Sequence, residues 1–447
     1  MGSVATRRIL IVGAGHVGFY TALWLSRRLS RELARQQVEI ALVDPQPHMT
    51  YQPFLPEAAA GSIEPRHAVV PLRRNLRRCR IIAGTVTKVD HADRTATVQT
   101  VDGPVRQITY DQIVLAPGSV SRTLPIPGLR EHAVGFKTLG EAIWLRNRVL
   151  ERLDVAAATD DVARRKRALT FVVIGAGYAG IEVLAELEDM TRWALRYYPE
   201  LRQQDVRWVL VEATGRVLPE VGPELGEYTL ARLRERDLDV RLDTRLVSCV
   251  DGKVELSDGD SFAADTVVWT AGVRAHPMLE HTDLPRDERG RLICLPTLQV
   301  VNGDQIVPGA WSAGDCAAVP DLTAEAPGAL CSPSAQHAVR QARQLADNLV
   351  AVLRGRAPTP YRHRHAGSVA SLGLHKGVAN VYRVKLRGWP AWFLHRTYHM
   401  SRIPTLASKV RVVADWTLAL FVRREVVALG QLHRPREPFT DVTPPVP

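Results

Sequence analysis

The sequence predicts an α/β protein in which parallel strands alternate with helices in two separate domains. Residues 9–18, ILIVGAGHVG, and residues 171–180, FVVIGAGYAG, carry this prediction. In each segment a short apolar run, typical of a buried parallel strand, leads through the glycine pattern GxGxxG into a helical pattern. Because this pattern occurs twice in 447 residues, a length that accommodates two or three domains, we expect two Rossmann-like domains.

Each glycine pattern is followed by a second apolar strand that ends in an acid. We expect the first helix to cover residues 16–33 and the strand after it to cover 38–44; the second helix begins near 178 and its strand covers 206–212. The glycines let the backbone and the helix N-terminus approach a pyrophosphate, and the acid accepts hydrogen bonds from ribose hydroxyls. The sequence therefore predicts two dinucleotide sites. They are formed by Gly13, Ala14, Gly15, His16, Val17, Gly18 and Asp44 and by Gly175, Gly177, Tyr178, Gly180 and Glu212.

Three other segments have simpler patterns. Residues 157–167 are polar and charged and predict a linker before the second glycine pattern. Residues 250–262 place turn residues between short strand-like runs and predict a hairpin. Residues 436–447 contain four prolines and no helical pattern, which predicts a flexible tail.

Composition excludes several classes of protein. Hydrophobic residues make up 46% and charged residues 23%, unlike a mostly disordered or collagen-like chain. No uncharged apolar run reaches ~18 residues, so we expect no membrane-spanning helix. A strand-like run begins at Ile9 without a preceding signal-peptide stretch, so we expect a cytosolic body. The five cysteines form no CxxC pair, and no His or carboxylate cluster has metal-ligand spacing; we expect reduced thiols and no metal.

The formal charge of +11 is concentrated near the C-terminus. Residues 361–436 contain 14 Lys and Arg against two acids, a net charge of +12, so the rest of the chain sums to −1. Such a block attracts an anionic surface, and without a groove-reading motif we expect no nucleic-acid binding. Aromatic residues among cations and a helical apolar stripe favour a lipid headgroup boundary, with a basic packing domain or a dimer interface as the alternative. The stripe consists of Leu406, Val410, Val413, Thr417, Leu420 and Phe421.

Three further glycine-containing motifs follow in a fixed order. Residues 116–118 read Ala-Pro-Gly, residues 270–272 read Thr-Ala-Gly, and residues 313–315 read Ala-Gly-Asp. Together with the two GxGxxG patterns, this order resembles the two-dinucleotide-binding-domain flavoproteins, the pyridine nucleotide:disulfide reductase superfamily. The resemblance implies that the first domain binds FAD and that the second, inserted domain binds NAD(P)H.

The same resemblance assigns individual positions. Asp315, with Gly314, matches the acid that holds the ribitol and pyrophosphate of the flavin, and Asp44 matches the acid on the adenosine ribose. The usual Ala-Thr-Gly motif contains a proline here, so a threonine contact is lost while the close backbone approach at the glycine survives. The other positions that the resemblance adds are Val86, Ala116 and Gly118 for FAD and Ala271 and Gly272 for NADH.

A narrower resemblance rests on three other segments. Disulfide reductases carry CxxxxC after the first helix; this chain does not, so electrons must leave the flavin for an acceptor that diffuses in. Residues 48–57, 335–341 and 406–430 together resemble the type II NADH dehydrogenases, the single-subunit NADH:quinone oxidoreductases. This resemblance implies that Gln52 lies near the flavin, that the helix of Gln336 flanks the flavin and the quinone head-group, and that the last segment docks on the membrane.

Four residues are candidates for the reaction itself. Glu182 matches a family glutamate near the nicotinamide–flavin contact that can donate a proton, or it only complements the helix dipole. Gln336 is kept, but Arg340 replaces the family's second helix glutamine and can point its guanidinium at a quinone carbonyl. Gln341 lies about 100° further around this helix. Lys376 can hydrogen-bond a quinone oxygen, or it is an ordinary surface lysine.

These inferences predict an NADH domain inserted in a discontinuous FAD domain, followed by a basic amphipathic membrane-docking region. We expect a hydride to pass from NADH to FAD, and two electrons to pass to a quinone of the menaquinone or ubiquinone type, without proton pumping. The expected protein is a homodimer, peripheral to the cytoplasmic face of the cell membrane. The alternatives are a soluble NAD(P)H-dependent flavin oxidoreductase with another small-molecule or protein acceptor and a non-catalytic NADH sensor. The expected limits are 1–125 and 281–365 for FAD, 126–280 for NADH, 366–435 for docking and 436–447 for the tail.

Overall fold

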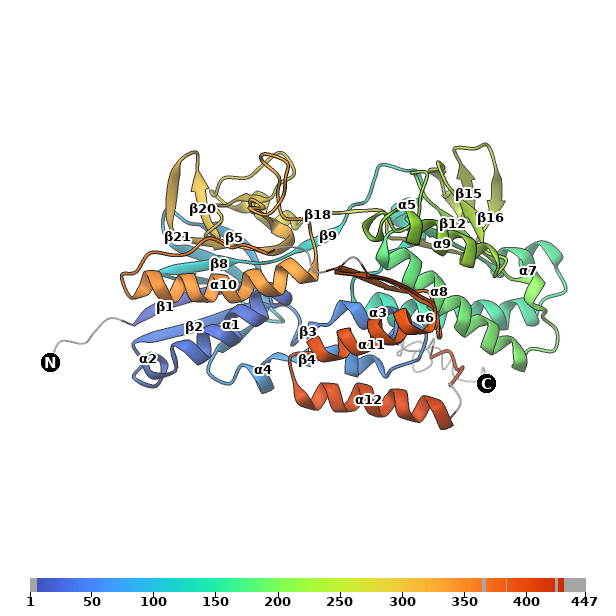
Figure 1. Cartoon of the computed structure of the whole chain (residues 1–447), viewed down its shortest axis with the longest axis horizontal. Coiled ribbons are helices and arrows are strands. Elements are labelled where there is room, and N and C mark those ends of the chain that lie inside the picture. The colour runs from blue at the N-terminus through green and yellow to red at the C-terminus, as the bar shows by residue number, and fades with distance from the viewer. Residues whose placement is uncertain (1–5, 364–366, 383, 423–424, 430–447) are drawn as a thin grey trace, which may run out of the picture. The chain divides into compact units, whose positions relative to one another are not determined.

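The computed structural model describes residues 6–363, 367–382, 384–422 and 425–429 (Figure 1). Contacts divide the chain into two compact units, each built from three segments. Each unit contains one of the two glycine patterns. They are named unit 1 (Met1–Tyr51, Val69–Val120 and Val273–His365) and unit 2 (Gln52–Ala68, Ser121–Gly272 and Ala366–Pro447).

An eight-stranded sheet forms the centre of unit 1, in the order β20-β21-β8-β1-β2-β5-β6-β7. The strands from β21 to β5 pair in parallel, whereas β20 and the β6–β7 hairpin are antiparallel additions at the two edges. The last four residues of β1 are buried, as expected for a central strand. The strands are β1 (Arg7–Val12), β2 (Val38–Asp44), β5 (Arg80–Asp90), β6 (Thr95–Thr100), β7 (Val105–Thr109), β8 (Gln112–Leu115), β20 (Gln299–Asn302) and β21 (Gln305–Ser312).

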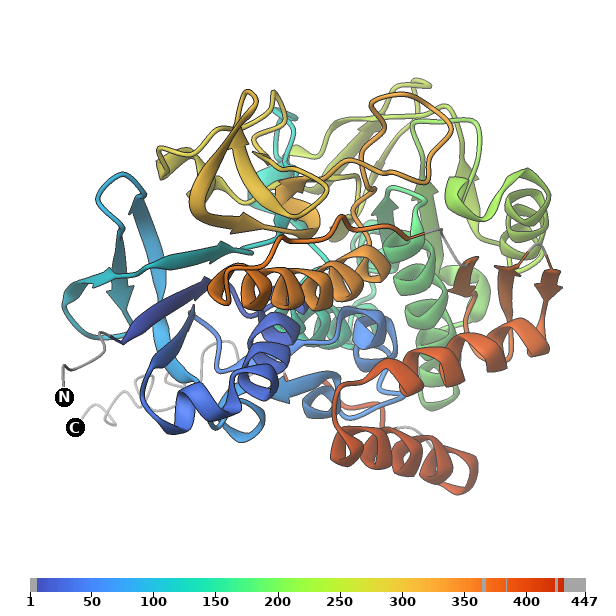
Figure 2. The ribbon, with the colours of Figure 1, turned by 60° about the vertical axis from the view of Figure 1, so that its left-hand side comes forward.

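Two helices of unit 1 pack against each other beside this sheet. They are α1 (His16–Arg28) and α10 (Ala335–Leu353), which lie side by side in Figure 2. The prediction of one helix over 16–33 is wrong in one respect, because a separate helix α2 (Ser30–Ala34) follows α1. The backbone of Leu29 leaves the helical region, with φ −104° and ψ 25°. The apolar period continues across this residue, so the sequence did not reveal the break.

Short elements complete unit 1. β3 pairs with β4, and β19 pairs with β22. A loop then leads from β22 to α10. These elements are β3 (His48–Thr50), β4 (Val69–Pro71), α4 (Leu72–Asn75), β18 (Val273–Ala275), η7 (Pro277–His281), β19 (Leu292–Ile293), η8 (Gly314–Cys316) and β22 (Ala317–Ala318). Strand β9 (Ser119–Ser121) ends one residue past the boundary of unit 1.

A five-stranded parallel sheet forms the centre of unit 2, in the order β10-β17-β11-β12-β13. Every residue of β11 and β17 is buried. The strands are β10 (Ala133–Val134), β11 (Thr170–Ile174), β12 (Arg207–Val211), β13 (Asp239–Arg241) and β17 (Thr266–Trp269). The helices that accompany them are α5 (Leu129–His132), α6 (Leu139–Ala157), α7 (Val162–Ala168), α8 (Tyr178–Ala194) and α9 (Pro223–Arg234).

Most local expectations for unit 2 are confirmed. α8 begins at Tyr178, and the hairpin forms from β15 (Lys253–Leu256) and β16 (Ser261–Ala263), beside β14 (Leu246–Ser248). The expected linker over 157–167 is wrong in part, because helix α7 occupies most of it. The side chain of Asp161 accepts hydrogen bonds from the first amides of α7 and caps the helix.

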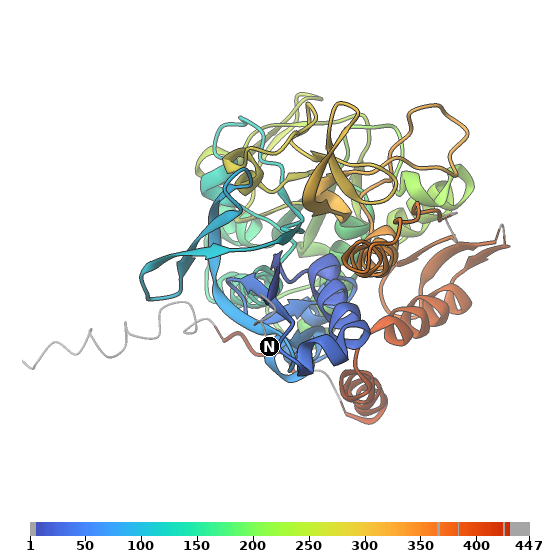
Figure 3. The same cartoon turned by 90° about the vertical axis from the view of Figure 1, so that its left-hand side faces the viewer.

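The C-terminal segment of unit 2 forms a small sheet and two helices. The antiparallel strands β23 (Gly367–Ser371), β24 (Gly377–Val381) and β25 (Val384–Arg387) precede α11 (Trp389–Arg402) and α12 (Leu406–Phe421). Figures 2 and 3 show α11 beside this sheet and α12 beside α11. α12 also contacts η2 (Pro65–Ala68), and α3 (Leu55–Ala59) packs against α6 and α8. The expected flexible tail, 436–447, lies outside the described residues.

The predicted α/β class is therefore confirmed by two sheets with parallel cores, each with a glycine turn after a central strand. The limits of the FAD-binding and NADH-binding parts stay a prediction, because the two units are defined by contacts between residues and not by a bound nucleotide. By contacts, residues 52–68 group with unit 2.

Candidate nucleotide and electron-transfer sites

The turn between β1 and α1 is shaped for a close approach to its backbone. Gly13 has φ +92°, a conformation that favours glycine, and a Cβ there would collide with the carbonyl of Ala116. A Cβ on Gly18 would collide with the Gly13 carbonyl, so Gly18 lets α1 pack against the turn. A Cβ on Gly15 would meet nothing within 4 Å. The N-terminus of α1 is therefore open at Gly15, as anion binding by a helix requires.

Asp44, the last residue of β2, holds this turn. Its Oδ2 accepts a hydrogen bond from the Ala14 amide at 2.6 Å, and its Oδ1 accepts one from the Gln46 amide at 2.7 Å. Burial raises the pKa of Asp44, and these two amide hydrogen bonds oppose the rise. Because an ionised carboxylate has about four acceptor sites, two amides leave capacity for ribose hydroxyls.

The Ala-Gly-Asp segment at 313–315 is fixed by two side-chain contacts. Asp315 Oδ2 accepts a hydrogen bond from Ser119 Oγ at 2.6 Å. The Gly314 amide donates to Gln341 Oε1 at 2.8 Å, and a Cβ on Gly314 would lie 2.7 Å from Val17 Cγ2. Sequence reasoning placed Gln341 off the functional face of α10 and missed this contact. Nothing in the spacing of 27 residues links the glutamine to the glycine.

His16 adds a polar atom to the same turn. Burial lowers the pKa of its imidazole to about 4, against the opposing charge of Asp315, so the ring is neutral at pH 7. Among the described residues, its buried Nε2 has no hydrogen-bond partner. Leaving such a group unpaired costs roughly 1–3 kcal/mol. The open turn and this nitrogen therefore fit a bound polar group such as the pyrophosphate of FAD.

The remaining positions expected around FAD have different surroundings. Val86 and Ala116 are buried, and Gly118 has φ +74° with nothing within 4 Å of a Cβ. Gln52 is exposed and belongs to unit 2, where its Nε2 donates to the Lys137 carbonyl at 3.3 Å. Its expected place near the flavin stays a prediction.

The turn between β11 and α8 repeats the first turn in unit 2. Gly175 has φ +104°, and a Cβ there would lie 2.9 Å from Thr270 Oγ1 and 3.0 Å from the backbone of Ala271. A Cβ on Gly180 would collide with the Gly175 carbonyl. The Thr270 hydroxyl donates toward the Ile174 and Gly175 carbonyls, at 2.9 and 3.0 Å. This residue ties the Thr-Ala-Gly strand end to the glycine turn.

Glu212 holds the second turn as Asp44 holds the first. Its Oε2 accepts a hydrogen bond from the Ala176 amide at 2.7 Å, and its Oε1 accepts the amide and the hydroxyl of Thr214, both at 2.9 Å. Gly272 has φ +90° with open space at its Cβ position, and a Cβ on Gly177 would come no closer than 3.7 Å to Glu220. The turn is thus open where a nucleotide would lie. Tyr178, half-buried at the start of α8, has a pKa raised by burial.

Glu182, on the first turns of α8, points into the interior of unit 2. It is 8% exposed, and its Oε1 accepts a hydrogen bond from the Ser371 amide at 3.0 Å. The same oxygen lies 3.0 Å from Nε2 of His395, a residue of α11 that is 2% exposed. Burial lowers the pKa of His395, but the hydrogen bond with Glu182 and the charges of Glu182, Glu57 and Glu186 outweigh it and raise the pKa. The glutamate therefore has a protonatable partner.

Glu57 of α3 is the next carboxylate in this interior. It accepts hydrogen bonds from Arg396 Nη2 at 2.7 Å and from Trp416 Nε1 at 2.8 Å. Burial raises the pKa of Glu57, yet Arg396 and Trp416 outweigh burial and lower it. The guanidinium of Arg396 lies over the Trp392 and Trp416 rings. Because His395 and Arg396 are neighbours in α11, these contacts bring polar groups of α3, α8, α11 and α12 together. Sequence reasoning missed His395, which lies 213 residues from Glu182 and carries no local motif.

The other candidate reaction residues lie in two places. Gln336 and Arg340 are half-buried on successive turns of α10 in unit 1, where Arg340 Nη1 donates to the Gln336 carbonyl at 3.0 Å. Gln336 Oε1 lies 3.3 Å from His363 Nε2. Lys376 belongs to unit 2, where it is exposed at the β23–β24 turn and its charge acts on Asp189. Within unit 2, His395 contacts Glu182. The catalytic role of Lys376 stays a prediction.

The helices α11 and α12 expose large apolar side chains. α12 turns Ser408, Val412 and half-buried Trp416 inward, and Asp415 accepts hydrogen bonds from the Glu64 amide and His67. Its opposite face is open, with Phe421 83% and Leu406 78% exposed. The helices in the described part of the chain are all too short or too polar to cross a membrane. The exposed apolar residues of the two helices are Trp389, Phe393, Leu406, Val410, Val413, Leu418 and Phe421.

Each unit therefore joins a parallel sheet to an open glycine turn with a carboxylate on the turn amide, an arrangement that defines a protein with two dinucleotide sites. The chain belongs to the pyridine nucleotide-disulphide oxidoreductase family, whose model matches residues 7–342. This result confirms the broader resemblance read from the motif order.

Similar proteins also confirm the narrower resemblance. The chain is 27% identical over 440 residues to the type II NADH:quinone oxidoreductase Ndh of Mycobacterium tuberculosis, covering 95% of this chain and 89% of the relative. It is 29% identical over 396 residues to the type II NADH:quinone oxidoreductase of Staphylococcus epidermidis, covering 87% and 93%. The structure of NDH2 from Plasmodium falciparum in complex with NADH has the same fold, with a TM-score of 0.86 and 16% identity, covering 95% of this chain and all of that one.

Proposed function

We propose that this protein is a type II NADH:quinone oxidoreductase that uses FAD, accepts a hydride from NADH and delivers two electrons to a quinone without pumping protons. The observation that carries the proposal is the pair of open glycine turns, one in each unit, each held by a strand-end carboxylate. The names of the two bacterial relatives support the donor and the acceptor.

Unit 1 supplies the residues that would hold FAD. The α1 N-terminus and His16 Nε2 would receive the pyrophosphate, Asp44 the adenosine ribose and Asp315 the ribitol end. Flavin, when bound, supplies the chemistry that converts a two-electron hydride donor into an electron donor for quinone. The chain contributes position, electrostatics and exclusion of water.

Unit 2 supplies the residues that would hold NADH. The α8 N-terminus would receive the pyrophosphate, and Glu212 would accept the 2′-hydroxyl of the adenosine ribose. A 2′-phosphate would place like charges together at this carboxylate, so NADH is the preferred donor. Two like charges about 4 Å apart at a partly screened site cost on the order of 2–4 kcal/mol.

The cysteines favour an acceptor that diffuses to the flavin. All five are free thiols. Burial raises the pKa of Cys79 to about 12 and that of Cys316 to about 11, so neither is a thiolate at neutral pH. A dithiol relay therefore has no support. On this proposal, Gln336 and Arg340 of α10 are the polar groups available to quinone oxygens.

The reaction consumes one proton beyond the hydride: NADH, quinone and one H⁺ give NAD⁺ and quinol. Glu182 and His395 are the residues we assign to supply it. The imidazole of His395 and the carboxyl group of Glu182 share a 3.0 Å contact in a buried site, and Glu182 lies beside the nucleotide turn in sequence. A positioned acid of this kind contributes roughly 10²–10⁴-fold to a proton-transfer step.

Because a quinone is lipophilic and lies in the membrane, this proposal gives the C-terminal segment the role of docking the protein there. The open apolar faces of α11 and α12, in a segment with a charge of +12, would dock the protein on the anionic cytoplasmic face of the cell membrane. The homodimer expected from the sequence stays a prediction, and sedimentation of the purified protein tests it.

The deciding experiment is steady-state NADH oxidation by the purified flavoprotein with and without quinone. The proposal expects quinone-dependent oxidation, faster than oxidation with oxygen or a protein acceptor. Turnover only with a non-quinone acceptor would favour the soluble oxidoreductase, and absence of turnover would favour a sensor. Flotation with liposomes separates the membrane part of the proposal from the enzymatic part.

A further inference from the structure

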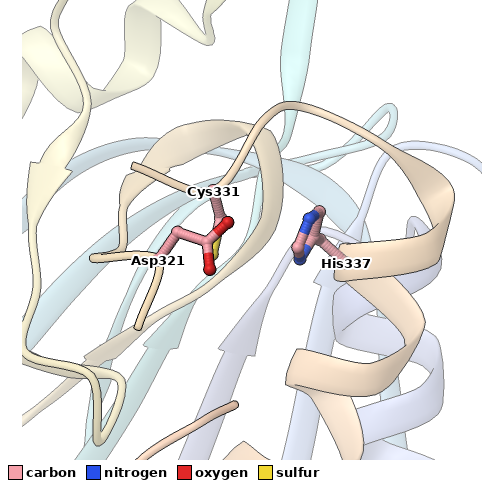
Figure 4. A group of neighbouring side chains, drawn as sticks. All are labelled: Asp321, Cys331 and His337. Carbon is pink, nitrogen blue, oxygen red and sulfur yellow. The ribbon is translucent and has the colours of Figure 1, made fainter. Parts of the chain in front are cut away.

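Three potential metal ligands meet in unit 1, at the start of α10. Asp321 and Cys331 lie on the loop between β22 and α10, and His337 lies on the first turn of α10 (Figure 4). One ligand atom from each lies within 4.8 Å of the other two. They stand ten and six residues apart in sequence, a spacing that no local metal motif has, so the cluster could not be predicted from the sequence.

We propose that Asp321, Cys331 and His337 form a binding site for one zinc-type divalent ion. Thiolate, imidazole and carboxylate together are ligands that zinc accepts in tetrahedral geometry, and three protein ligands leave a fourth position for water. In such a site the ligand atoms stand about 3.3–3.8 Å apart, since zinc bonds are about 2.0–2.3 Å long. The loop therefore needs to tighten by about 1 Å around the ion.

The charges of the cluster suit a divalent cation. A zinc ion with one carboxylate and one thiolate forms a neutral centre, which a site with a buried cysteine and a buried histidine can hold at low cost. Without metal, burial raises the pKa of Cys331 to about 11, and the charge of Asp321 adds to the rise. The ion would replace the thiol proton, so binding releases about one proton per ion at neutral pH.

Neighbouring groups hold two of the ligands in place. Tyr361 Oη lies 3.0 Å from His337 Nδ1, a contact that orients the ring as second partners of metal-bound histidines do. Asp321 Oδ1 accepts hydrogen bonds from the amide and hydroxyl of Thr323, at 2.9 and 2.8 Å. These contacts fix the ring and carboxylate before an ion arrives. The proposal uses unit 1 alone and does not depend on the proposed function.

The test uses the full-length, flavin-loaded protein equilibrated with zinc chloride, desalted and analysed for zinc by mass spectrometry. We expect about one zinc per chain. Cys331→Ser and His337→Gln should each lower the retained zinc at least about 10-fold, and Tyr361→Phe should weaken binding by about 10-fold. Cys79→Ser, which removes the most exposed cysteine, should keep the full content. A wild-type protein without zinc, or equal zinc in the Cys331 variant, overturns the proposal.

Cobalt(II) gives a second readout that needs no variant. Bound by a thiolate in tetrahedral geometry, it should produce ligand-field bands at longer wavelength than flavin absorption, and equimolar zinc should remove them. Flavin content and melting temperature without metal show whether the variants fold. Absence of these bands in the wild-type protein contradicts the site, whatever the variants do.

Discussion

The two glycine turns have nearly the same backbone but different side-chain surroundings. Gly13 and Gly175 have φ values of +92° and +104°, and the Ala14 and Ala176 amides donate to a strand-end carboxylate at 2.6 and 2.7 Å. In unit 1 the turn carries a buried histidine nitrogen; in unit 2 the helix carries Glu182 into a cluster with His395. The comparison teaches that two turns with nearly the same backbone differ in the side chains beside them. On the proposed function, the shared backbone would bind the two nucleotides, and these side chains would set what each bound nucleotide can do.

The largest expected effect comes from blocking one turn only. Gly175→Val should abolish reduction of the flavin by NADH, with a loss of at least roughly 100-fold, because strain at φ +104° alone costs about 1–3 kcal/mol and the side chain meets Thr270 and Ala271. Flavin content should stay at the wild-type level. Gly13→Val should instead remove flavin from the purified protein. Anaerobic flavin reduction and flavin stoichiometry are the measurements.

Gly140→Ala is the matched control for these variants, because Gly140 lies in α6 and a Cβ there would make only an ordinary contact, 3.9 Å from Thr138 Oγ1. This variant should change neither the flavin content nor the reduction of the flavin by NADH. If the Gly175 variant lost flavin and kept NADH-dependent reduction of the remainder, the assignment of the two turns would be reversed.

The second prediction concerns the Glu182–His395 pair of unit 2. His395→Gln should slow flavin reoxidation by quinone by about 10²–10⁴-fold if His395 supplies the proton, and should change flavin reduction by NADH much less. The pKa of His395 lies above its ordinary value, so the proton is held at lower pH and lost as pH rises through that raised value. Wild-type reoxidation should therefore decline on the alkaline side.

The pH profile distinguishes this role from a structural one. In the His395 variant the alkaline decline should disappear, whereas His375→Gln, an exposed histidine of the same segment, should leave it unchanged. An unaltered profile in the His395 variant would remove this residue from the proton path.

The sequence predicted the backbone of both turns better than the contacts around them. Strand β2 ends at Asp44 and α8 begins at Tyr178, as the patterns indicated, because glycine turns and buried strands have local signatures. The break at Leu29 and the helix α7 have weaker signatures and were missed. His395 reaches Glu182 through tertiary packing, and no spacing rule brings such a residue to its partner.

A smaller effect is expected at Glu212, the carboxylate that accepts the turn amide in unit 2. Glu212→Gln keeps an acceptor for the ribose but removes the charge that repels a 2′-phosphate. The ratio of kcat/KM for NADPH to that for NADH should rise roughly 30-fold or more, from about 2–4 kcal/mol of repulsion removed. Glu235→Gln, an exposed acid on the same unit, should not change the ratio. Equal ratios in the two variants would show that Glu212 does not select the nucleotide.

The smallest effect on chemistry is expected at the exposed face of α12. Replacing Leu406, Val410 and Phe421 together with serine should let high salt release the protein from anionic liposomes, because each large side chain contributes at most about 1.5–3 kcal/mol at the interface. Activity with a water-soluble quinone should persist. Serine at Val101 and Val105, exposed valines of unit 1, should leave flotation unchanged. Salt-resistant flotation of the α12 variant would place the docking surface elsewhere.

The central claim is that the two turns bind partners of one electron path that ends at quinone. Anaerobic stopped-flow absorbance on the wild-type protein tests it most directly, by mixing first with NADH and then with quinone. The account predicts bleaching of the flavin by one equivalent of NADH and full return of the absorbance with one equivalent of quinone, with quinol as product. Flavin that NADH reduces but quinone does not reoxidise would contradict it.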